Sequence, residues 1–172
     1  FISNHASGGK GGALSLNESQ GDTVRLSTFT LNTAKEGGAV YMYQAKSVQI
    51  LQCRFEENSG NYGGGIYLEG SGTETNPILF TNCIFWNNQA DYGGGAVLGT
   101  DSHNLDSYLN LDYCTLTGNK AEEGGVSEGG GVHIAIGSKL TISSSLLWNN
   151  MADEYQEIYS LFSAYVTVNY SD

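Results

Sequence analysis

Short apolar pairs, each split by one residue of a different kind, recur along the whole chain. Val48 and Ile50 form one pair, and Cys53 and Phe55 form the next. Such alternation places both members of a pair on the same face of a β-strand. No stretch shows the 3.6-residue period of a helix for long enough. The other pairs are Leu14/Leu16, Val40/Met42, Ile66/Leu68, Ile78/Phe80, Cys83/Phe85, Leu109/Leu111, Cys114/Leu116, Val132/Ile134, Leu140/Ile142, Ser145/Leu147 and Val166/Val168.

Two sequence steps between these pairs repeat in register. One step ends in an asparagine three residues after a large apolar residue, as from Phe55 to Asn58. The other runs from two glycines through a small residue into an aliphatic one, as at Ile66. A period of 20 to 50 residues is typical of solenoids and other repeat folds. The asparagines are Asn4, Asn32, Asn58, Asn88, Asn119 and Asn150, spaced by 28, 26, 30, 31 and 31 residues.

The repeats predict an all-β chain folded as a parallel β-helix, also called a β-solenoid. Each coil is expected to contain three short strands, and the 172 residues provide about six coils. We expect residues 1–172 to form a single β-helix segment. Both ends lack the polar cap that terminal solenoid repeats normally have, so a fragment of a longer repeat protein is expected.

The charge of the chain limits its partners. The formal net charge is −11, from 18 acidic and seven basic residues. Such a charge argues against binding to nucleic acid or to anionic membrane surfaces. No run of 18 apolar residues is present, so this segment is not expected to insert into a membrane.

Three cysteines, Cys53, Cys83 and Cys114, fall one coil apart, with Ser27 and Ser145 on either side in the same file. A buried ladder of small side chains explains this spacing without any chemistry. Two stacked cysteines could instead form one disulfide. No CxxC or CxxH pair is present to suggest a zinc site. The asparagines and glycines are likewise interpreted as structural turn residues.

Insertions mark the likeliest binding surface. Two loops in adjacent coils, Glu69–Pro77 and Gly99–Ser107, are each four residues longer than their counterparts and should form one projecting lip. A third insertion, Lys120–Glu128, lies at the asparagine turn. Protruding loops on a rigid scaffold commonly carry binding residues. The candidates on the lip are Glu74, Asp101, His103 and Asp106.

Outward positions of the strand after the glycines form another candidate surface. This file could stack sugar rings or contact a protein, or it could stabilise the sheet by aromatic stacking. Trp86 and Trp148 occupy one equivalent position two coils apart, either covering turns or contacting a neighbouring segment. The members of the file are Ser15, Tyr41, Tyr67, Leu98, His133 and Tyr159, of which Tyr41, Tyr67, His133 and Tyr159 are the binding candidates.

Catalytic and metal chemistry receive little support from the outward files. Neither file on the other two strands contains an acid, whereas glycoside hydrolysis needs two carboxylates at a set separation. We therefore assign no catalytic, cofactor or metal residue. Most acids lie in turns, where Ca²⁺ binding by stacked oxygen ligands stays open. Two sequons, at Asn17 and Asn169, are possible glycosylation sites.

The repeats resemble a known family. The FxxN steps ending at Asn32, Asn58 and Asn88, together with GGA before Leu14, Val40 and Val97, look like the repeats of polymorphic outer membrane proteins. The resemblance implies a right-handed parallel β-helix on a bacterial surface, with an adhesive role. The closing stretch, LLWNNMADEYQEIY and VTVNYSD, is similar to secreted β-helix proteins of the pectate-lyase-like superfold. Leu116, Leu147 and Glu157 depart from the repeat pattern.

The sequence favours a non-enzymatic, extracellular structural or adhesive segment of a cell-surface or appendage protein. Its expected partners are a host or neighbouring cell-surface protein or glycan, or other segments of the same assembly. No cofactor is expected beyond the open question of Ca²⁺. One alternative is a polysaccharide lyase or glycoside hydrolase of the β-helix superfold. The other is a structural subunit of an extracellular filament.

Overall fold

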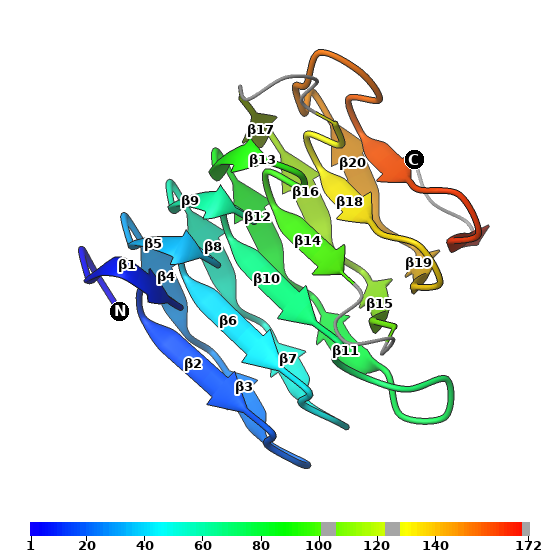
Figure 1. Cartoon of the computed structure of the whole chain (residues 1–172), viewed down its shortest axis with the longest axis horizontal. Coiled ribbons are helices and arrows are strands. Elements are labelled where there is room, and N and C mark those ends of the chain that lie inside the picture. Colours follow the sequence, from blue (N-terminus) through cyan, green and yellow to red (C-terminus); the bar gives the residue numbers. More distant parts are fainter. Residues whose placement is uncertain (101–105, 123–127, 170–172) are drawn as a thin grey trace.

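The computed structural model shows a parallel β-solenoid, and it describes residues 1–100, 106–122 and 128–169. Strands from successive coils lie side by side along the solenoid axis (Figure 1). All strand pairs between neighbouring coils are parallel. The chain completes about five turns, and β21 and β22 begin another, which is close to the expected six.

Four parallel sheets run along the solenoid, and we number them by the order of their strands in a coil. Sheet 1 contains β1 (His5–Lys10), β5 (Thr33–Glu36), β9 (Ser59–Tyr62), β13 (Gln89–Tyr92) and β17 (Lys120–Ala121). Sheet 2 contains β2 (Leu14–Asn17), β6 (Val40–Tyr43), β10 (Ile66–Glu69), β14 (Val97–Thr100), β18 (Val132–Ile134) and β21 (Ile158–Ser160). Sheet 3 contains β3 (Thr23–Arg25), β7 (Gln49–Leu51), β11 (Ile78–Thr81), β15 (Tyr108–Asp112), β19 (Lys139–Ser143) and β22 (Tyr165–Asn169). Sheet 4 contains β4 (Thr28–Thr30), β8 (Arg54–Glu56), β12 (Ile84–Trp86), β16 (Thr115–Thr117) and β20 (Leu146–Trp148).

The three strands expected in each coil are present as sheets 2, 3 and 4. Their register is the one that the repeats predict, since Ile66 pairs with Val40 on one side and Val97 on the other. Sheet 1 adds a fourth short strand directly after the asparagine turn. Its inward positions hold small residues, such as Gly60 between Ala34 and Ala90. The sequence shows no apolar pair there, so alternation could not reveal this strand.

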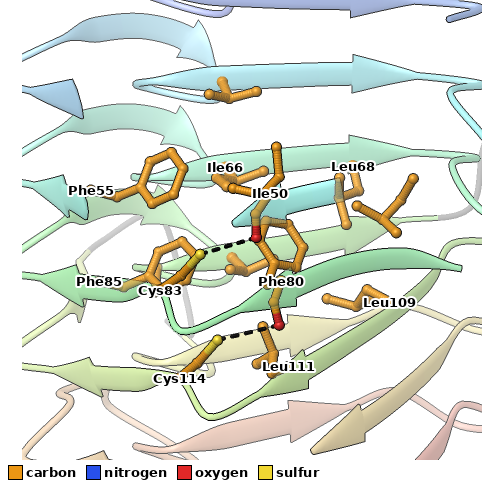
Figure 2. Close-up of a cluster of buried hydrophobic side chains, with 14 of the residues drawn as sticks. Ile50, Phe55, Ile66, Leu68, Phe80, Cys83, Phe85, Leu109, Leu111 and Cys114 are labelled. Carbon is orange, nitrogen blue, oxygen red and sulfur yellow. Dashed lines mark hydrogen bonds between the residues drawn. The ribbon is translucent and has the colours of Figure 1, made fainter. Parts of the chain in front are cut away.

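The core is built from files of similar apolar side chains stacked along the axis. Phe29, Phe55 and Phe85 are fully buried, and their rings stack at centroid distances of 4.9 and 4.8 Å. Figure 2 shows Phe55 and Phe85 within this core. Aliphatic pairs from sheets 2 and 3 fill the rest of the interior. Burial of such side chains contributes roughly 1.5–3 kcal/mol each. The hydrophobic effect therefore holds the coils together at equivalent positions in every turn.

A file of buried asparagines closes the turn between sheets 4 and 1. Asn58 donates from its backbone nitrogen and its Nδ2 to Oδ1 of Asn88, at 3.1 and 2.9 Å. Its Nδ2 also donates to the carbonyl oxygen of Phe29 at 2.9 Å. Asn32, Asn88 and Asn119 repeat the donations to the next asparagine. The side chain thus satisfies backbone groups that the turn would otherwise leave unpaired.

Glu157 ends this asparagine file. The backbone nitrogen and Nδ2 of Asn150 donate to the two carboxylate oxygens of Glu157, at 3.4 and 2.5 Å. The carboxylate therefore takes the acceptor role that an asparagine amide plays in the earlier coils. Glu157, the residue that departs from the glycine pattern, is thus the last acceptor of this file.

The cysteine file is also present. All three thiols are free and buried, and Cys83 and Cys114 donate to the carbonyl oxygens of Ile50 and Phe80 in the preceding coil (Figure 2). The Ser145 hydroxyl takes the equivalent position and bonds to Leu111. The structural interpretation of this file is confirmed, and the alternative of a disulfide is not seen.

The glycine pairs before sheet 2 allow neighbouring backbones to approach closely. A Cβ on Gly38 would lie 2.1 Å from the carbonyl oxygen of Gly64, and one on Gly95 would lie 2.4 Å from that of Gly130. Real Cβ atoms do not approach backbone oxygens this closely, so only glycine fits these positions. The repeat of the glycine pair thus reflects contact between coils at this corner.

Candidate functional site

The lip and sheet 3 together line a groove, which we call the lip groove. One cavity of about 610 Å³ is bordered by Glu74, Asp106, Tyr108, Lys139 and Tyr165. A second cavity of about 300 Å³ shares the first three of these residues and extends to Gln44 and Lys46. Since the two cavities meet at the same side chains, the groove runs along the solenoid axis across several coils.

Strand register positions the floor of the lip groove. Lys139 begins β19 and pairs with Tyr108 on one side and Tyr165 on the other. Neighbouring parallel strands lie about 4.8 Å apart, so the two tyrosines are separated by roughly 10 Å with the lysine between them. The Tyr165 side chain is 66% exposed, whereas Tyr108 is half-buried. The floor thus offers one lysine between two aromatic rings.

The charges around the groove are mixed. Lys139 Nζ lies 3.4 Å from Glu74 Oε1, which forms an ion pair across the groove. Burial, together with the nearby carboxylates of Asp106 and Glu74, raises the pKa of the Tyr108 hydroxyl. That hydroxyl is therefore neutral at physiological pH and able to donate a hydrogen bond. The lip groove can bind a ligand through aromatic contact, hydroxyl groups and charges of both signs.

The structure brings two of the four predicted lip residues together. Glu74 and Asp106 come from separate loops and border both cavities. The predicted residues Asp101 and His103 lie outside the described residues. Tyr108, Lys139 and Tyr165 were not predicted from sequence, because each precedes the inward pair of its strand and has no distinctive neighbours. Only the stacking of three coils places them under the lip.

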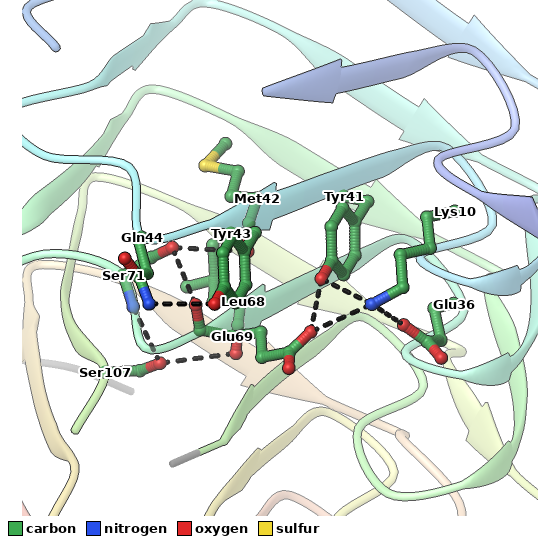
Figure 3. Close-up of polar contacts among 10 residues, drawn as sticks. All are labelled: Lys10, Glu36, Tyr41, Met42, Tyr43, Gln44, Leu68, Glu69, Ser71 and Ser107. Atoms are coloured by element: carbon green, nitrogen blue, oxygen red, sulfur yellow. Dashed lines mark hydrogen bonds and ion pairs between the residues drawn. The ribbon is translucent and has the colours of Figure 1, made fainter. Parts of the chain in front are cut away.

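The predicted tyrosine file has the expected register but is not an open surface. Tyr41 pairs with Ser15 and Tyr67, yet it is only 3% exposed. Its hydroxyl donates to Glu69 and accepts a 2.7 Å hydrogen bond from Lys10 (Figure 3). The expectation that Tyr41 contacts a partner is therefore wrong, because the side chain is enclosed by polar groups of neighbouring coils.

A polar cluster around the half-exposed Lys10 explains the enclosure of Tyr41. Lys10 Nζ lies 2.9 Å from Glu36 and 3.1 Å from Glu69, and 4.4 Å from the centre of the Tyr41 ring. Burial acts to lower the pKa of Lys10, but hydrogen bonds to Tyr41, Glu36 and Glu69 outweigh it and raise the pKa. The cluster joins three consecutive coils. It is a structural clamp, since one ammonium group connects residues that are far apart in sequence.

The remaining candidates in this file are partly buried. Tyr67 stacks on Tyr41 at 5.7 Å between ring centroids. His133 packs edge-on against Tyr159 at 4.9 Å. Burial lowers the pKa of His133 to about 4, an effect that the Glu128 backbone only partly offsets. Partner binding by Tyr67, His133 and Tyr159 stays a prediction. A catalytic acid or base role would need a histidine that titrates nearer to neutrality.

The two sequons differ in their surroundings. Asn17 is exposed at the end of β2, but the hydroxyl oxygen of Ser19 in the same sequon is buried without a hydrogen-bond partner. Asn169 is exposed at the end of β22, and Ser171 of its sequon lies outside the described residues. Glycosylation at both asparagines stays a prediction.

The part of the chain that the structure describes contains neither a metal-binding cluster nor an activated thiol at Cys53 or Cys83. No group of three His, Cys, Asp or Glu side chains there is arranged to hold a metal ion. Burial raises the pKa of the Cys53 thiol. A hydrogen bond with Cys114 and then burial raise the pKa of the Cys83 thiol. Reactive cysteines need the thiolate, so both thiols are structural.

Comparison with known proteins supports the architecture. The described residues contain no helix that could cross a membrane. No curated protein and no solved structure matches the chain. The family described as "Right handed beta helix region" matches residues 1–112 of the 172. This match indicates that the parallel four-sheet solenoid is right-handed. The chain therefore belongs to the family of right-handed β-helix regions.

Proposed function

We propose that this chain is a non-enzymatic, extracellular β-helix segment of a cell-surface or appendage protein. The β-helix acts as a rigid scaffold, and the lip groove binds a surface protein or glycan of a host or neighbouring cell. The observation that carries this proposal is the continuous groove formed by Glu74, Asp106, Tyr108, Lys139 and Tyr165. The sequence resemblance to polymorphic outer membrane proteins is consistent with such a location.

The form of the groove suits an extended partner. From Lys46 to Tyr165 it crosses five neighbouring strands, which corresponds to roughly 19 Å at about 4.8 Å per strand. An extended peptide of about six residues has a similar length, as does a short run of sugar rings. Tyr165 provides an exposed aromatic surface, and such side chains often dominate binding energy. A rigid floor also reduces the entropy lost on binding.

Two features favour binding over catalysis. Glu74 is ion-paired with Lys139, so its charge is already partly compensated. Gln49, Leu79, Asn110 and Thr141 share one outward position of β7, β11, β15 and β19, and none of them is an acid. Asp112, at the end of β15, borders neither cavity. The proposed function needs no bound metal. Chelation of Ca²⁺ is therefore expected to leave partner binding unchanged.

A cell-binding assay tests the proposal. The purified chain carrying a fluorescent label should bind to cells or to an array of surface glycans and proteins. Tyr165→Ala should reduce this binding at least about tenfold, as expected for an aromatic residue central to an interface. Tyr113→Ala is the matched control, because Tyr113 is 60% exposed but lies outside the groove. Equal binding by wild type and Tyr165→Ala would refute the role of the groove.

The same groove leaves one enzymatic alternative to test. Glu74 and Asp106 both border the larger cavity, and a carboxylate pair is the usual requirement for glycoside hydrolysis. Polysaccharides would be incubated with the chain, and new reducing ends and unsaturated products would be measured. We expect none. Turnover that is lost in both Glu74→Gln and Asp106→Asn would establish the hydrolase or lyase instead.

The filament alternative predicts self-association. If the chain were a filament subunit, light scattering would increase with concentration as coils of separate molecules stacked end to end. We expect a concentration-independent mass. A mass that rises steadily with protein concentration would favour the filament over the adhesive segment.

A further inference from the structure

The outward face of sheet 4 carries an exposed aromatic surface that is separate from the lip groove. Trp86 on β12 is 41% exposed and Trp148 on β20 is 68% exposed. Both pair with Thr117, which lies on the strand between them. Leu146, one column away, is also 42% exposed. We call Trp86, Thr117, Trp148 and the adjoining Ile84, Thr115 and Leu146 the tryptophan platform.

The spacing of the platform is set by the solenoid. The two tryptophans are two strands apart, so their Cα atoms are separated by roughly 9.6 Å at about 4.8 Å per strand. Neither indole stacks on another aromatic ring among the described residues, and the smaller Thr117 side chain lies on the strand between them. The β-sheet therefore presents two broad aromatic surfaces at a regular interval, with a hydroxyl group at the midpoint.

Polar groups flank the aromatic rings at the adjacent turn. Asn87 and Asn149 follow the two tryptophans directly, and both are exposed with positive φ angles of 51° and 57°. Oδ1 of Asn87 lies 2.4 Å from the position that a Cβ atom on Gly118 would occupy. The Asn87 amide thus reaches across to the turn that follows the middle strand of the platform. Amides beside aromatic faces can bind hydroxyl groups of a ligand.

The charge of the platform selects an uncharged ligand. None of its six side chains can ionise, although the whole chain has a net charge of −11. The nearest charged residues on the same sheet, Arg54 and Glu56, are paired with each other through a 2.6 Å hydrogen bond from Nε to Oε1. Long-range repulsion disfavours an anionic ligand. Exposed apolar surface of this kind is a frequent mark of a binding site.

We infer that the tryptophan platform binds an uncharged, extended β-1,4-linked glycan lying along the solenoid axis. In such a chain every second sugar ring presents the same face, and this repeat is close in length to two strand spacings. Alternate rings would stack on Trp86 and Trp148, because the CH-rich face of a sugar packs against an aromatic ring. The intervening ring would lie over Thr117, within reach of its hydroxyl and of the Asn87 amide.

Calorimetric titration of the full chain with cellohexaose tests this inference, and tryptophan fluorescence gives a second signal. Trp86→Ala and Trp148→Ala should each lower the affinity at least about tenfold. Both residues are exposed, so circular dichroism should show an unchanged fold. Tyr165→Ala, in the lip groove, should leave cellohexaose binding unchanged. The two sites can therefore fail independently.

A variant with altered tryptophan spacing distinguishes the proposed binding geometry from non-specific binding to exposed aromatic residues. The double change Thr117→Trp with Trp148→Thr keeps two tryptophans but moves them one strand apart. We expect it to lose affinity as strongly as Trp148→Ala. Retained affinity in this variant would overturn the inference. The same conclusion would follow if millimolar cellohexaose did not bind to the wild type, or if both alanine variants bound it normally.

Discussion

The asparagine file and the cysteine file are both buried polar columns, yet they differ in how much of the fold depends on them. Asn88 accepts two hydrogen bonds from Asn58 and donates to Asn119 and to the Phe55 carbonyl oxygen. Cys83, only five residues earlier, donates a weak hydrogen bond at 3.3 Å to Ile50. The amide both donates and accepts, so it can propagate along a file. The thiol mainly fills space.

This difference explains which residues vary along the two files. Every complete coil keeps asparagine, whereas the other file contains both cysteine and serine. Ser145 repeats the bond of the thiols to a carbonyl oxygen of the preceding coil. A position that needs one small donor accepts either residue, while a position that must satisfy backbone and side-chain groups in two coils accepts only the amide.

The largest effect is expected from Asn88→Ala. The change removes four buried hydrogen bonds and leaves the Asn58 backbone nitrogen without an acceptor. We expect the free energy of unfolding to fall by about 3–5 kcal/mol. Urea unfolding followed by circular dichroism measures this loss. Asn61→Ala is the matched control, because its side chain is exposed and donates to Asp91. Comparable losses in the two variants would contradict the role of the file.

A partly buried histidine in the outward file of sheet 2 should respond to pH. Burial lowers the pKa of His133 from 6.5 to about 4, so the folded state favours the neutral ring. The histidine's contribution to stability is therefore lost as pH falls from about 6.5 through 4. The full shift corresponds to about 3 kcal/mol, and partial exposure of the ring reduces this to about 2 kcal/mol.

The control for this pH effect comes from the same file. His133→Leu reproduces the residue that the preceding coil has at this position, Leu98. Urea midpoints from pH 7 to pH 4 should fall more steeply for the wild type than for this variant. The carboxylates contribute equally to both proteins, so they cancel in the difference. If the urea midpoints of the two proteins fell in parallel with pH, protonation of His133 would not destabilise the folded state.

The sequence predicted the interior far better than the exterior. Inward residues such as Phe55 and Ile66 recur because each must match the coil above and below, so their period reveals the fold. The small inward residues of sheet 1, such as Gly60, give no apolar alternation, and that strand was missed. Tyr41 was expected on the surface because it points outward from its strand. Its burial depends on Lys10, Glu36 and Glu69, whose positions no local pattern indicates.

The candidate site shows the same limit. The lip loops were predicted because insertions interrupt the period, and Glu74 and Asp106 do meet there. The floor residues Tyr108, Lys139 and Tyr165 are ordinary residues at strand starts, and their alignment requires the coil register. The sequence places Trp86 and Trp148 at equivalent positions. Only their exposed fractions in the structure show that they form a surface instead of packing over the turns.

The end of the asparagine file should matter less than its middle. Glu157→Ala removes two acceptors from Asn150 but leaves its bond to the Leu116 carbonyl oxygen. Because water can reach this partly buried position, we expect a loss of about 1–2 kcal/mol. Glu157→Gln retains one amide oxygen and should lose less. A larger loss for glutamine than for alanine would show that Glu157 does not act as an acceptor cap.

The smallest effect is expected from Cys83→Ser. The serine hydroxyl can donate to the Ile50 carbonyl oxygen as Ser145 does to that of Leu111, at 3.3 Å. We therefore expect the free energy of unfolding to change by less than about 1 kcal/mol, the usual net worth of one hydrogen bond. Ser145→Cys is the reciprocal control and should be similarly mild. If Cys83→Ser lost as much stability as Asn88→Ala, the fold would depend equally on the two files. That result would contradict a space-filling role for the thiols.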